Sequence, residues 1–181
     1  AVWHGTLAED DLERRIAAVA GTAGPDLLAR YRRRMPGASP ADRLVSMLSA
    51  CNFQVRSALL AERKAAQSAP VWMYRFDWTT PAFGGRLKAC HSVEVPFVFD
   101  TLSVIGEDHR RNGAQALADR VSGAWAAFAR TGRPDHAGLP AWPAFGAARR
   151  ETMLFDDECR VVPDPEGDVR AAWAAVAQRR T

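Results

Sequence analysis

The spacing of apolar positions changes near residue 70, and the secondary structure that it predicts changes with it. Over residues 1–68, apolar side chains recur every three or four positions, which is the spacing of one face of an α-helix. Residues 71–78 are instead β-branched and aromatic and contain neither glycine nor proline, a pattern typical of a β-strand. The sequence therefore predicts a helical region over 1–68, followed over 69–181 by a region that contains a sheet.

Capping signals and helix breakers divide the helical region into four expected helices. Thr6 and Glu9 have the spacing of a capping box, in which each side chain bonds a free backbone N–H of the first turn. We expect this first helix to end at Gly21, because glycine readily ends a helix. The other three are expected to begin at Pro25, at Ser39-Pro40 and near Phe53, and the last of them to end near Gln67.

The sheet region is expected to hold one long helix and a strand pair. Residues 112–130 carry an apolar stripe on one helical face, made of Ala116, Leu117, Val121, Trp125 and Phe128. Short strands near 152–155 and 160–162 follow, with an acidic turn between them, and a last helix spans about 166–178. Strand, loop, long helix, strand pair and helix form an α/β arrangement. We expect residues 1–181 to form a single unit.

Charge and hydropathy argue against two classes of partner. The net charge is +3 over 181 residues, but basic residues are scattered among acidic ones. Only Arg32, Arg33 and Arg34 cluster, just before an expected helix end, where cations stabilise the helix itself. We therefore expect no nucleic-acid partner. No run of about 18 or more apolar residues occurs, so we expect no membrane span.

The three cysteines, Cys51, Cys90 and Cys159, are widely spaced and form no Cys-x-x-Cys pair. They predict neither a metal site nor a disulfide framework. Because thiols stay reduced in the cytoplasm, we expect a cytoplasmic protein. His91 and Glu94 have the spacing of two metal ligands, but without a third ligand this pattern is too common to predict a metal.

Catalytic chemistry has one candidate among the four histidines, His91. It follows a glycine-containing loop just after the predicted strand, and such loops gather ligands and catalytic groups in α/β sheets. A catalytic histidine also needs a nucleophile and an orienting acid. The spacing shows neither, so a purely structural histidine stays open as the alternative. His4, His109 and His136 lie in polar or terminal surroundings and are expected on the surface.

The nucleophile is the missing part of this chemistry. Gly-x-Ser-x-Gly, the strand-to-helix elbow that exposes a serine hydroxyl, occurs nowhere in the sequence. Ser122 lies inside the predicted long helix. Cys90 and Ser92 adjoin His91 in the chain, and adjacent residues rarely form a nucleophile–base pair. The residues alone therefore predict no complete catalytic site.

Several segments resemble the type-B carboxylesterases of the para-nitrobenzyl esterase kind. Residues 70–78 are similar to the strand that precedes the histidine loop of that family. Residues 89–99 are similar to its histidine motif, usually Gly-Ala-x-His-Gly-x-Glu-Leu-Pro-Phe-Val-Phe. Residues 125–132, 138–143 and 152–162 match further family motifs in order and spacing. The resemblance extends from about Leu44 to Trp173.

The resemblance implies the C-terminal part of an α/β-hydrolase fold, with His91 as the general base and acid of a Ser-His-Glu triad. In that fold the serine comes first, then the acid, then the histidine, so both partners of His91 are expected before Ala1. The intact enzyme is expected to hydrolyse small-molecule carboxylic esters, with no metal and no cofactor. The chain alone is then a fragment that we expect to be inactive towards esters.

Three positions depart from the family pattern. Ser92 replaces the glycine after the histidine, Cys90 replaces an alanine, and Ala50 stands where the family often has an aspartate. Each departure affects a detail, and none removes the base. Residues 5–10 echo the family's acid motif only faintly, and we keep the capping box as their interpretation.

A second hypothesis from a different class stays open, namely a non-catalytic remnant or interaction module that docks on another chain. We also expect the isolated chain to self-associate. The reason is that several aromatic side chains would lie bare without the rest of the enzyme, namely Trp72, Trp78, Trp125, Trp142 and the run 97–99.

Overall fold

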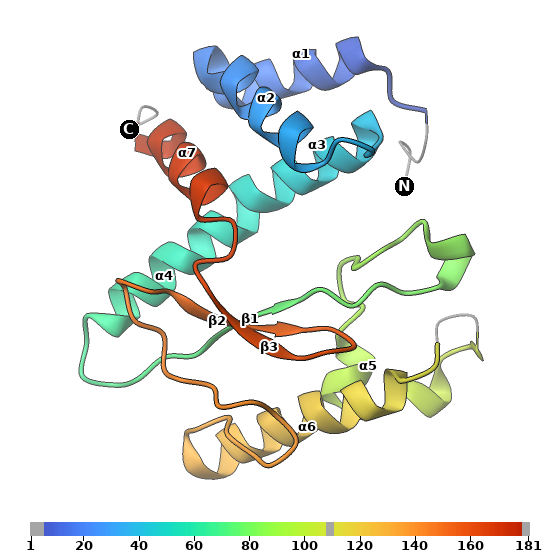
Figure 1. Cartoon of the computed structure of the whole chain (residues 1–181), viewed down its shortest axis with the longest axis vertical. Coiled ribbons are helices and arrows are strands. Elements are labelled where there is room, and N and C mark those ends of the chain that lie inside the picture. The colour runs from blue at the N-terminus through green and yellow to red at the C-terminus, as the bar shows by residue number, and fades with distance from the viewer. Residues whose placement is uncertain (1–5, 108–110, 179–181) are drawn as a thin grey trace. The chain divides into compact units, whose positions relative to one another are not determined.

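The chain forms two compact units. The structure, a computed structural model, describes residues 6–107 and 111–178 (Figure 1). The helical unit consists of Ala1–Leu60 and Glu166–Thr181, and the sheet unit consists of Ala61–Pro165. The regions expected at 1–68 and 69–181 correspond to these units only in part, because the last helix returns to the helical unit. That the whole chain behaves as a single unit stays a prediction.

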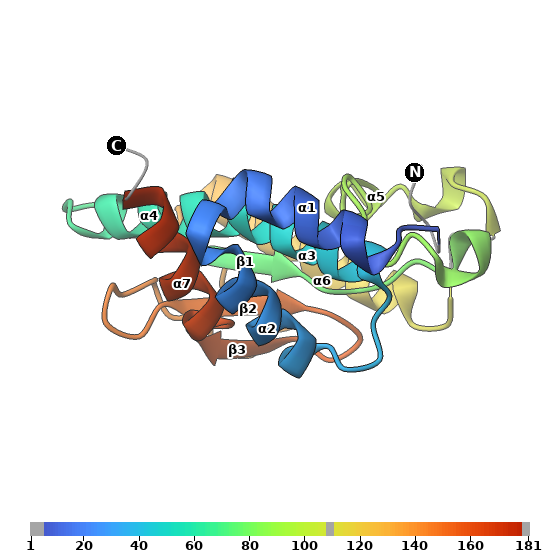
Figure 2. The same cartoon turned by 90° about the horizontal axis from the view of Figure 1, so that it is seen from above.

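The helical unit holds most of the helices that the sequence predicts (Figure 2). A π-helical stretch, Ala50–Gln54, joins the third helix to the fourth, so the two form one continuous helix, Pro40–Ala65. The elements are α1 (Glu9–Ala20), a 3₁₀ turn (Gly21–Ala23), α2 (Gly24–Arg34), α3 (Pro40–Ser49), α4 (Val55–Ala65), whose last turn belongs to the sheet unit, and α7 (Gly167–Gln178).

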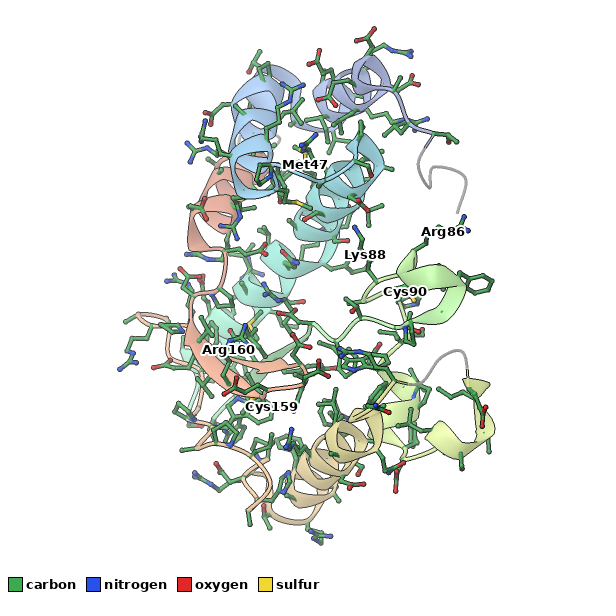
Figure 3. All side chains as sticks on the ribbon, turned by 45° about the vertical axis from the view of Figure 1, so that its right-hand side comes forward. Met47, Arg86, Lys88, Cys90, Cys159 and Arg160 are labelled. Carbon is green, nitrogen blue, oxygen red and sulfur yellow. The ribbon has the colours of Figure 1, made fainter. Side chains whose placement is uncertain are left out.

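An apolar core holds these helices together, and Figure 3 shows Met47 among them. Trp173 of α7 donates an indole hydrogen bond of 3.3 Å to the hydroxyl of Tyr31 in α2. Burial raises the pKa of the Tyr31 hydroxyl, so this group remains neutral in the core. The largest side chains of this core that are fully buried are Trp173, Tyr31, Leu12, Ile16, Leu27, Leu44 and Met47.

Helix capping follows the sequence at α3 but not at α1. The hydroxyl of Ser39 accepts the Asp42 N–H at 3.1 Å, and the Asp42 carboxylate accepts the Ser39 N–H at 3.4 Å, which completes a capping box. The capping box expected at Thr6 is wrong, because α1 begins at Glu9 after an extended Ala8. Three carboxylates in the first turn of α1 interact favourably with the helix dipole instead.

The continuous helix Pro40–Ala65 is long and apolar enough to cross a membrane by length and composition alone. Core helices of globular domains pass the same criterion, and Leu44, Met47 and Val55 of this helix are buried in the helical core. The absence of a membrane partner therefore stays a prediction.

The sheet unit is built on a three-stranded sheet with the strand order β1-β2-β3. Its strands are β1 (Met73–Phe76), β2 (Glu151–Phe155) and β3 (Arg160–Pro163). β1 pairs with β2 in parallel, with Met73 opposite Thr152, and β2 pairs with β3 as an antiparallel hairpin. Parallel neighbours need a long crossover connection, which here carries a 3₁₀ turn (Ala82–Gly85), α5 (Val95–Val98), a second 3₁₀ turn (Leu102–Val104) and α6 (Ala114–Thr131).

One face of the sheet and α6 enclose a second apolar core. Tyr74 of β1 contacts Trp125 of α6 edge-on at 4.9 Å between ring centroids, and Trp142 contacts Phe155 of β2 at 5.7 Å. The expectation of bare aromatic side chains is therefore wrong for the four tryptophans and Phe97, whereas Phe99 is exposed. Trp78, Trp142 and Phe97 are buried within this core, because α6 and α5 of the same chain cover them.

The apolar stripe of α6 lies slightly off its predicted face. Leu117 and Val121 are buried as expected, but Ala116 is exposed and Phe128 is 51% exposed. Small side chains that the stripe left out, Ala114, Ala118, Ala124 and Ala127, complete the buried face. Alanine lets the helix approach the aromatic side chains of the sheet closely.

Replacing Ser39 by alanine tests the cap of α3. We expect Ser39→Ala to lower the free energy of unfolding by about 1 kcal/mol, because the Asp42 N–H loses its acceptor. Ser57→Ala is the matched control, since Ser57 is exposed in the interior of the continuous helix Pro40–Ala65 and alanine is the better helix former. Chemical denaturation of both variants checks this. Equal stabilities would contradict the importance of the cap.

Candidate active-site loop

The loop that carries His91 begins where β1 ends. The backbone N–H groups of Asp77 and Trp78 both donate to the carbonyl of Phe155 in β2, at 2.8 and 3.2 Å. This shared acceptor ends the regular ladder and directs the chain away from the sheet. Thr80 then pairs with Lys88, whose carbonyl accepts the Thr80 N–H at 3.2 Å, and closes the loop at its base.

Left-handed residues allow the loop to turn back on itself. Gly84 and Gly85 have φ values of 66° and 77°, which glycine adopts without steric cost. Phe83 and Lys88 have φ values of 55° and 52° without that freedom. In Figure 3, Arg86, Lys88 and Cys90 lie along this loop on the way to His91.

His91 itself lies on a tight turn that leads directly into α5. The Val93 N–H donates to the Cys90 carbonyl at 3.1 Å, and the Val95 N–H donates to the Ser92 carbonyl at 3.2 Å. Ser92 has a φ of 66°, a conformation that favours glycine. Ser92, which replaces the family's glycine, therefore lies at a position whose left-handed backbone conformation favours glycine.

An open hollow of about 180 Å³ lies beside His91. Its walls are mainly apolar, and its polar contributions come from Thr80, Cys90, His91 and Ser92. No carboxylate lines it among the residues that the structure describes. A hollow of this kind can hold a small apolar group next to an imidazole.

The imidazole of His91 is exposed to solvent. Within residues 6–107 and 111–178 it makes no hydrogen bond or ion pair. Glu94 is partly buried at the start of α5 and lies near Tyr74, where burial and then the Glu94 charge raise the pKa of the tyrosine. Both ring nitrogens of His91 are thus available, and the described residues bring neither an acid nor a nucleophile to them.

Ser122 and Cys159 make hydrogen bonds to nearby backbone carbonyls, which gives each of them a structural role. Ser122 lies in α6 and donates to the Asp119 carbonyl at 3.5 Å. Cys159 donates to the Asp156 carbonyl at 3.6 Å, and burial raises the pKa of its thiol. No group of three or more metal-ligating side chains occurs in the described part of the chain.

His136 has a structural task that the sequence did not reveal. Its Nδ1 accepts the Gly138 N–H at 3.1 Å, so its Nε2 carries the hydrogen and donates to the Arg120 carbonyl at 2.9 Å. The ring fills the space left by two glycines. A Cβ added at Gly123 would lie 2.9 Å from Cε1 of His136, and one at Gly138 would lie 2.7 Å away.

His136 thus connects residues 133–140 to α6 through its two hydrogen bonds. It is partly buried, whereas the sequence predicted a surface position. The one sequence signal for this contact is Gly123 inside the long helix, which the sequence analysis did not use. An interior glycine costs helix stability and so requires a reason. His4 and His109 lie outside the described residues, so the expectation for them stays a prediction.

Comparison with known proteins finds carboxylesterases and related hydrolases. A family model described as "Carboxylesterase family" matches residues 12–169. Para-nitrobenzyl esterase of Bacillus subtilis (strain 168) is 40% identical over 111 residues, which are 59% of this chain and 22% of that protein. Phenmedipham hydrolase of Pseudarthrobacter oxydans is 32% identical over 129 residues, 67% of this chain and 26% of its own length.

Solved structures show the same likeness. A carboxylesterase of Geobacillus stearothermophilus superimposes with a TM-score of 0.78 at 35% identity, covering 92% of this chain and 35% of its own. A thermophilic para-nitrobenzyl esterase gives a TM-score of 0.68 at 29% identity. The predicted α/β class is confirmed, as a part of the α/β-hydrolase fold. The chain spans about a quarter of the curated relatives that it matches.

Replacing Ser92 by glycine tests the strain at the His91 turn. A left-handed non-glycine residue costs about 1–2 kcal/mol, and glycine costs about 0.4–1 kcal/mol of unfolded-chain entropy. We therefore expect Ser92→Gly to raise the free energy of unfolding by up to about 1 kcal/mol. Ser122→Gly, the same change at a helical position, should lower it by about 0.5 kcal/mol. Loss of stability in both variants would argue against strain at Ser92.

Replacing Gly123 by alanine tests the packing of His136. Alanine favours the helix by about 1 kcal/mol, but the new methyl group overpacks the imidazole, which typically costs about 1–3 kcal/mol. We expect Gly123→Ala to lower the melting temperature. In a His136→Ala background the same change should raise it, because the ring is gone. A rise in both backgrounds would contradict the contact.

Proposed function

The chain belongs to the carboxylesterase family, and we propose that it is the C-terminal part of a serine-dependent carboxylic ester hydrolase in which His91 is the triad histidine. One observation carries this proposal. His91 is an exposed imidazole without a partner in the described residues. It lies on a hydrogen-bonded turn in the loop that follows a parallel strand, beside an apolar hollow. Catalytic groups of open α/β sheets gather at that end of the strands.

The chemistry assigned to His91 is the movement of one proton in each half of the reaction. A serine hydroxyl attacks the ester carbonyl and loses its proton to the imidazole, which then gives that proton to the departing alcohol. In the second half, the imidazole takes a proton from the attacking water and then gives it to the serine oxygen as the acyl–serine bond breaks, which releases the acyl group as a carboxylic acid. His91 ends each cycle in the neutral form in which it began.

The serine and the acid of this triad lie outside the chain under this proposal. Ser92 and Cys90 are the nearest candidate nucleophiles in the sequence. They are the immediate chain neighbours of His91, and in the described residues neither side chain is hydrogen-bonded to the imidazole. The second imidazole nitrogen of His91 is free to receive an orienting carboxylate. The substrate class, carboxylic esters, follows from the family and is part of the proposal. A cytoplasmic setting, in which the thiols of Cys51, Cys90 and Cys159 stay reduced, is also part of it.

A non-catalytic role is the alternative, and Ser92 favours it. Ser92 has a φ of 66° at the position where the family motif has glycine, and a chain without a catalytic role has no need to keep that glycine. The two readings differ in one outcome, namely whether His91 can serve a serine that another segment supplies.

A chimeric enzyme tests the proposal. Residues 44–173 of this chain replace the matching part of the para-nitrobenzyl esterase of Bacillus subtilis, and hydrolysis of para-nitrophenyl esters is measured. We expect activity that falls by at least about 10²–10⁴-fold on His91→Gln, because the general base is lost. Cys90→Ala is the matched control in the same loop and should change activity little.

Two results would contradict the triad role. One is a folded, active chimera whose rate is unchanged by His91→Gln. The other is ester hydrolysis by the 181-residue chain alone that is lost on His91→Ala, which requires a nucleophile within the chain. A folded chimera without activity, verified by its melting transition, would favour the non-catalytic alternative.

A further inference from the structure

The chain contains two asparagines, and their surroundings differ sharply. Asn52 lies inside the π-helical stretch Ala50–Gln54, whereas Asn112 lies in a turn immediately before α6 (Figure 1). Asn52 is followed by Phe53, and Asn112 is followed by Gly113. Asparagine is one of the thermolabile residue types, because its side-chain amide can react with the backbone nitrogen of the next residue. The surroundings of that nitrogen therefore decide which of the two asparagines reacts.

The backbone nitrogen that follows Asn112 is uncrowded and open to water. Asn112 and Gly113 are both exposed, and both line an open hollow of about 380 Å³ at the surface. A Cβ added to Gly113 would meet no described atom within 4 Å. Within residues 6–107 and 111–178, neither the Asn112 side chain nor the Gly113 N–H makes a hydrogen bond. This nitrogen is therefore available for a reaction with the neighbouring side chain.

The start of α6 favours a negative charge at the same nitrogen. Gly113 is the N-cap residue of this 18-residue helix, whose first turn has no acidic side chain and whose cap lacks a side-chain hydrogen bond. The amino end of a helix carries partial positive charge and stabilises anions there. The Gly113 nitrogen becomes an anion when it loses its proton, so the helix stabilises the form in which this nitrogen is a nucleophile.

One backbone hydrogen bond holds the turn closed. The Ala114 N–H donates to the Arg111 carbonyl at 3.1 Å, across Asn112 and Gly113. The reaction rotates the peptide group between these two residues, so this hydrogen bond has to open for a moment. Opening at a helix end has a small free-energy cost. Glycine also permits the rotation, because it has no Cβ to restrict its backbone.

We propose that Asn112 is a site of spontaneous covalent modification, at which the asparagine becomes aspartate or isoaspartate. The deprotonated Gly113 nitrogen attacks the side-chain carbonyl carbon of Asn112, and the amide nitrogen takes up a proton and leaves as ammonia. The new bond closes a succinimide ring. Water then opens the ring: cleavage at the side-chain carbonyl gives aspartate, and cleavage at the main-chain carbonyl gives isoaspartate. In total one water enters and one ammonia leaves, without oxidation or reduction.

Two other amides of the chain serve as internal comparisons. Asn52 lies inside a helix, where helical hydrogen bonding engages the N–H of the next residue, and the side chain of Phe53 crowds that nitrogen. Gln115 lies close to the proposed site in the chain, but its amide donates to two carboxylates at 2.7 and 2.9 Å. Its longer side chain would also have to close a larger and less favourable ring. We expect neither amide to react.

The modification reaches the loop of His91 through Arg111. The Arg111 guanidinium forms an ion pair with Asp157, donates to the Thr79 carbonyl at 3.3 Å, and lies 4.9 Å from the ring centroid of Trp78. The last two residues begin the loop that carries His91. Aspartate adds a carboxylate next to Arg111 in the chain, and isoaspartate adds a methylene group to the backbone between Arg111 and α6. Either product thus alters the residue that joins this loop to the β2–β3 turn.

Incubation of the 181-residue chain at mildly alkaline pH tests the proposal. Samples are digested with pepsin in acid, where ring closure is slow, and the peptides are identified by mass spectrometry. We expect progressive loss of the Asn112 amide and the appearance of both aspartate and isoaspartate, the latter detected by enzymatic methylation. Asn52 and Gln115 should keep their amides in the same samples. Near-ultraviolet circular dichroism checks that the chain stays folded.

Asn112→Gln is the matched variant, because it keeps an amide at the exposed position but lengthens the side chain. It should form no isoaspartate. A free peptide of residues 111–118 calibrates the reaction, and a folded chain that keeps its Asn112 amide after the peptide has lost its own would overturn the proposal. Aspartate without isoaspartate, equal loss at Asn52, or isoaspartate in Asn112→Gln would also contradict it. No ester takes part, so these results do not depend on the triad role of His91.

Discussion

The position of the candidate active-site loop depends on the backbone carbonyl of Phe155 in β2. It accepts the N–H groups of Asp77 and Trp78 together, and so fixes where β1 stops being a strand and becomes a loop. Because β1 runs parallel to β2, this end is the end at which α/β proteins place their reactive groups. A shift of the register by one residue would move Trp78 out of the core and turn the loop to the opposite face. The position of His91 is therefore set by a contact made some distance from it in the chain.

Local signals predicted most elements of the fold. A strand forms inside the expected range 71–78, although only over Met73–Phe76. The hairpin near residue 155 and the helix that begins at Pro40 also form where their residue types favour them, because backbone propensity and side-chain burial agree there. Contacts between segments distant in the sequence were harder to predict. The α1 capping box failed because an extended Ala8 moved the helix start, and the joining of α3 to α4 depends on how their apolar faces pack.

The candidate site divides in the same way. His91 was predicted from the strand and loop before it and from the family motif around it. The structure places it on an exposed turn, and its catalytic role stays a proposal. The aromatic residues were misjudged, since a pattern shows that a side chain is apolar without showing which element covers it. Trp78 and Trp142 are buried by α5, α6 and the strands of their own unit. The task of His136 was hidden as well, because it requires two glycines from separate segments to meet one ring.

The return of α7 to the helical unit has a consequence for the order in which the protein is made. Trp173 closes a core whose other walls, including Tyr31 and Leu12, are synthesised more than a hundred residues earlier. Ribosomes add about 5–20 residues each second, so α1, α2 and α3 wait for several seconds with an incomplete core. During that interval their apolar faces are open to chaperones and to premature association. The sheet unit, which is continuous in sequence, can fold first and is then already in place when the last helix arrives.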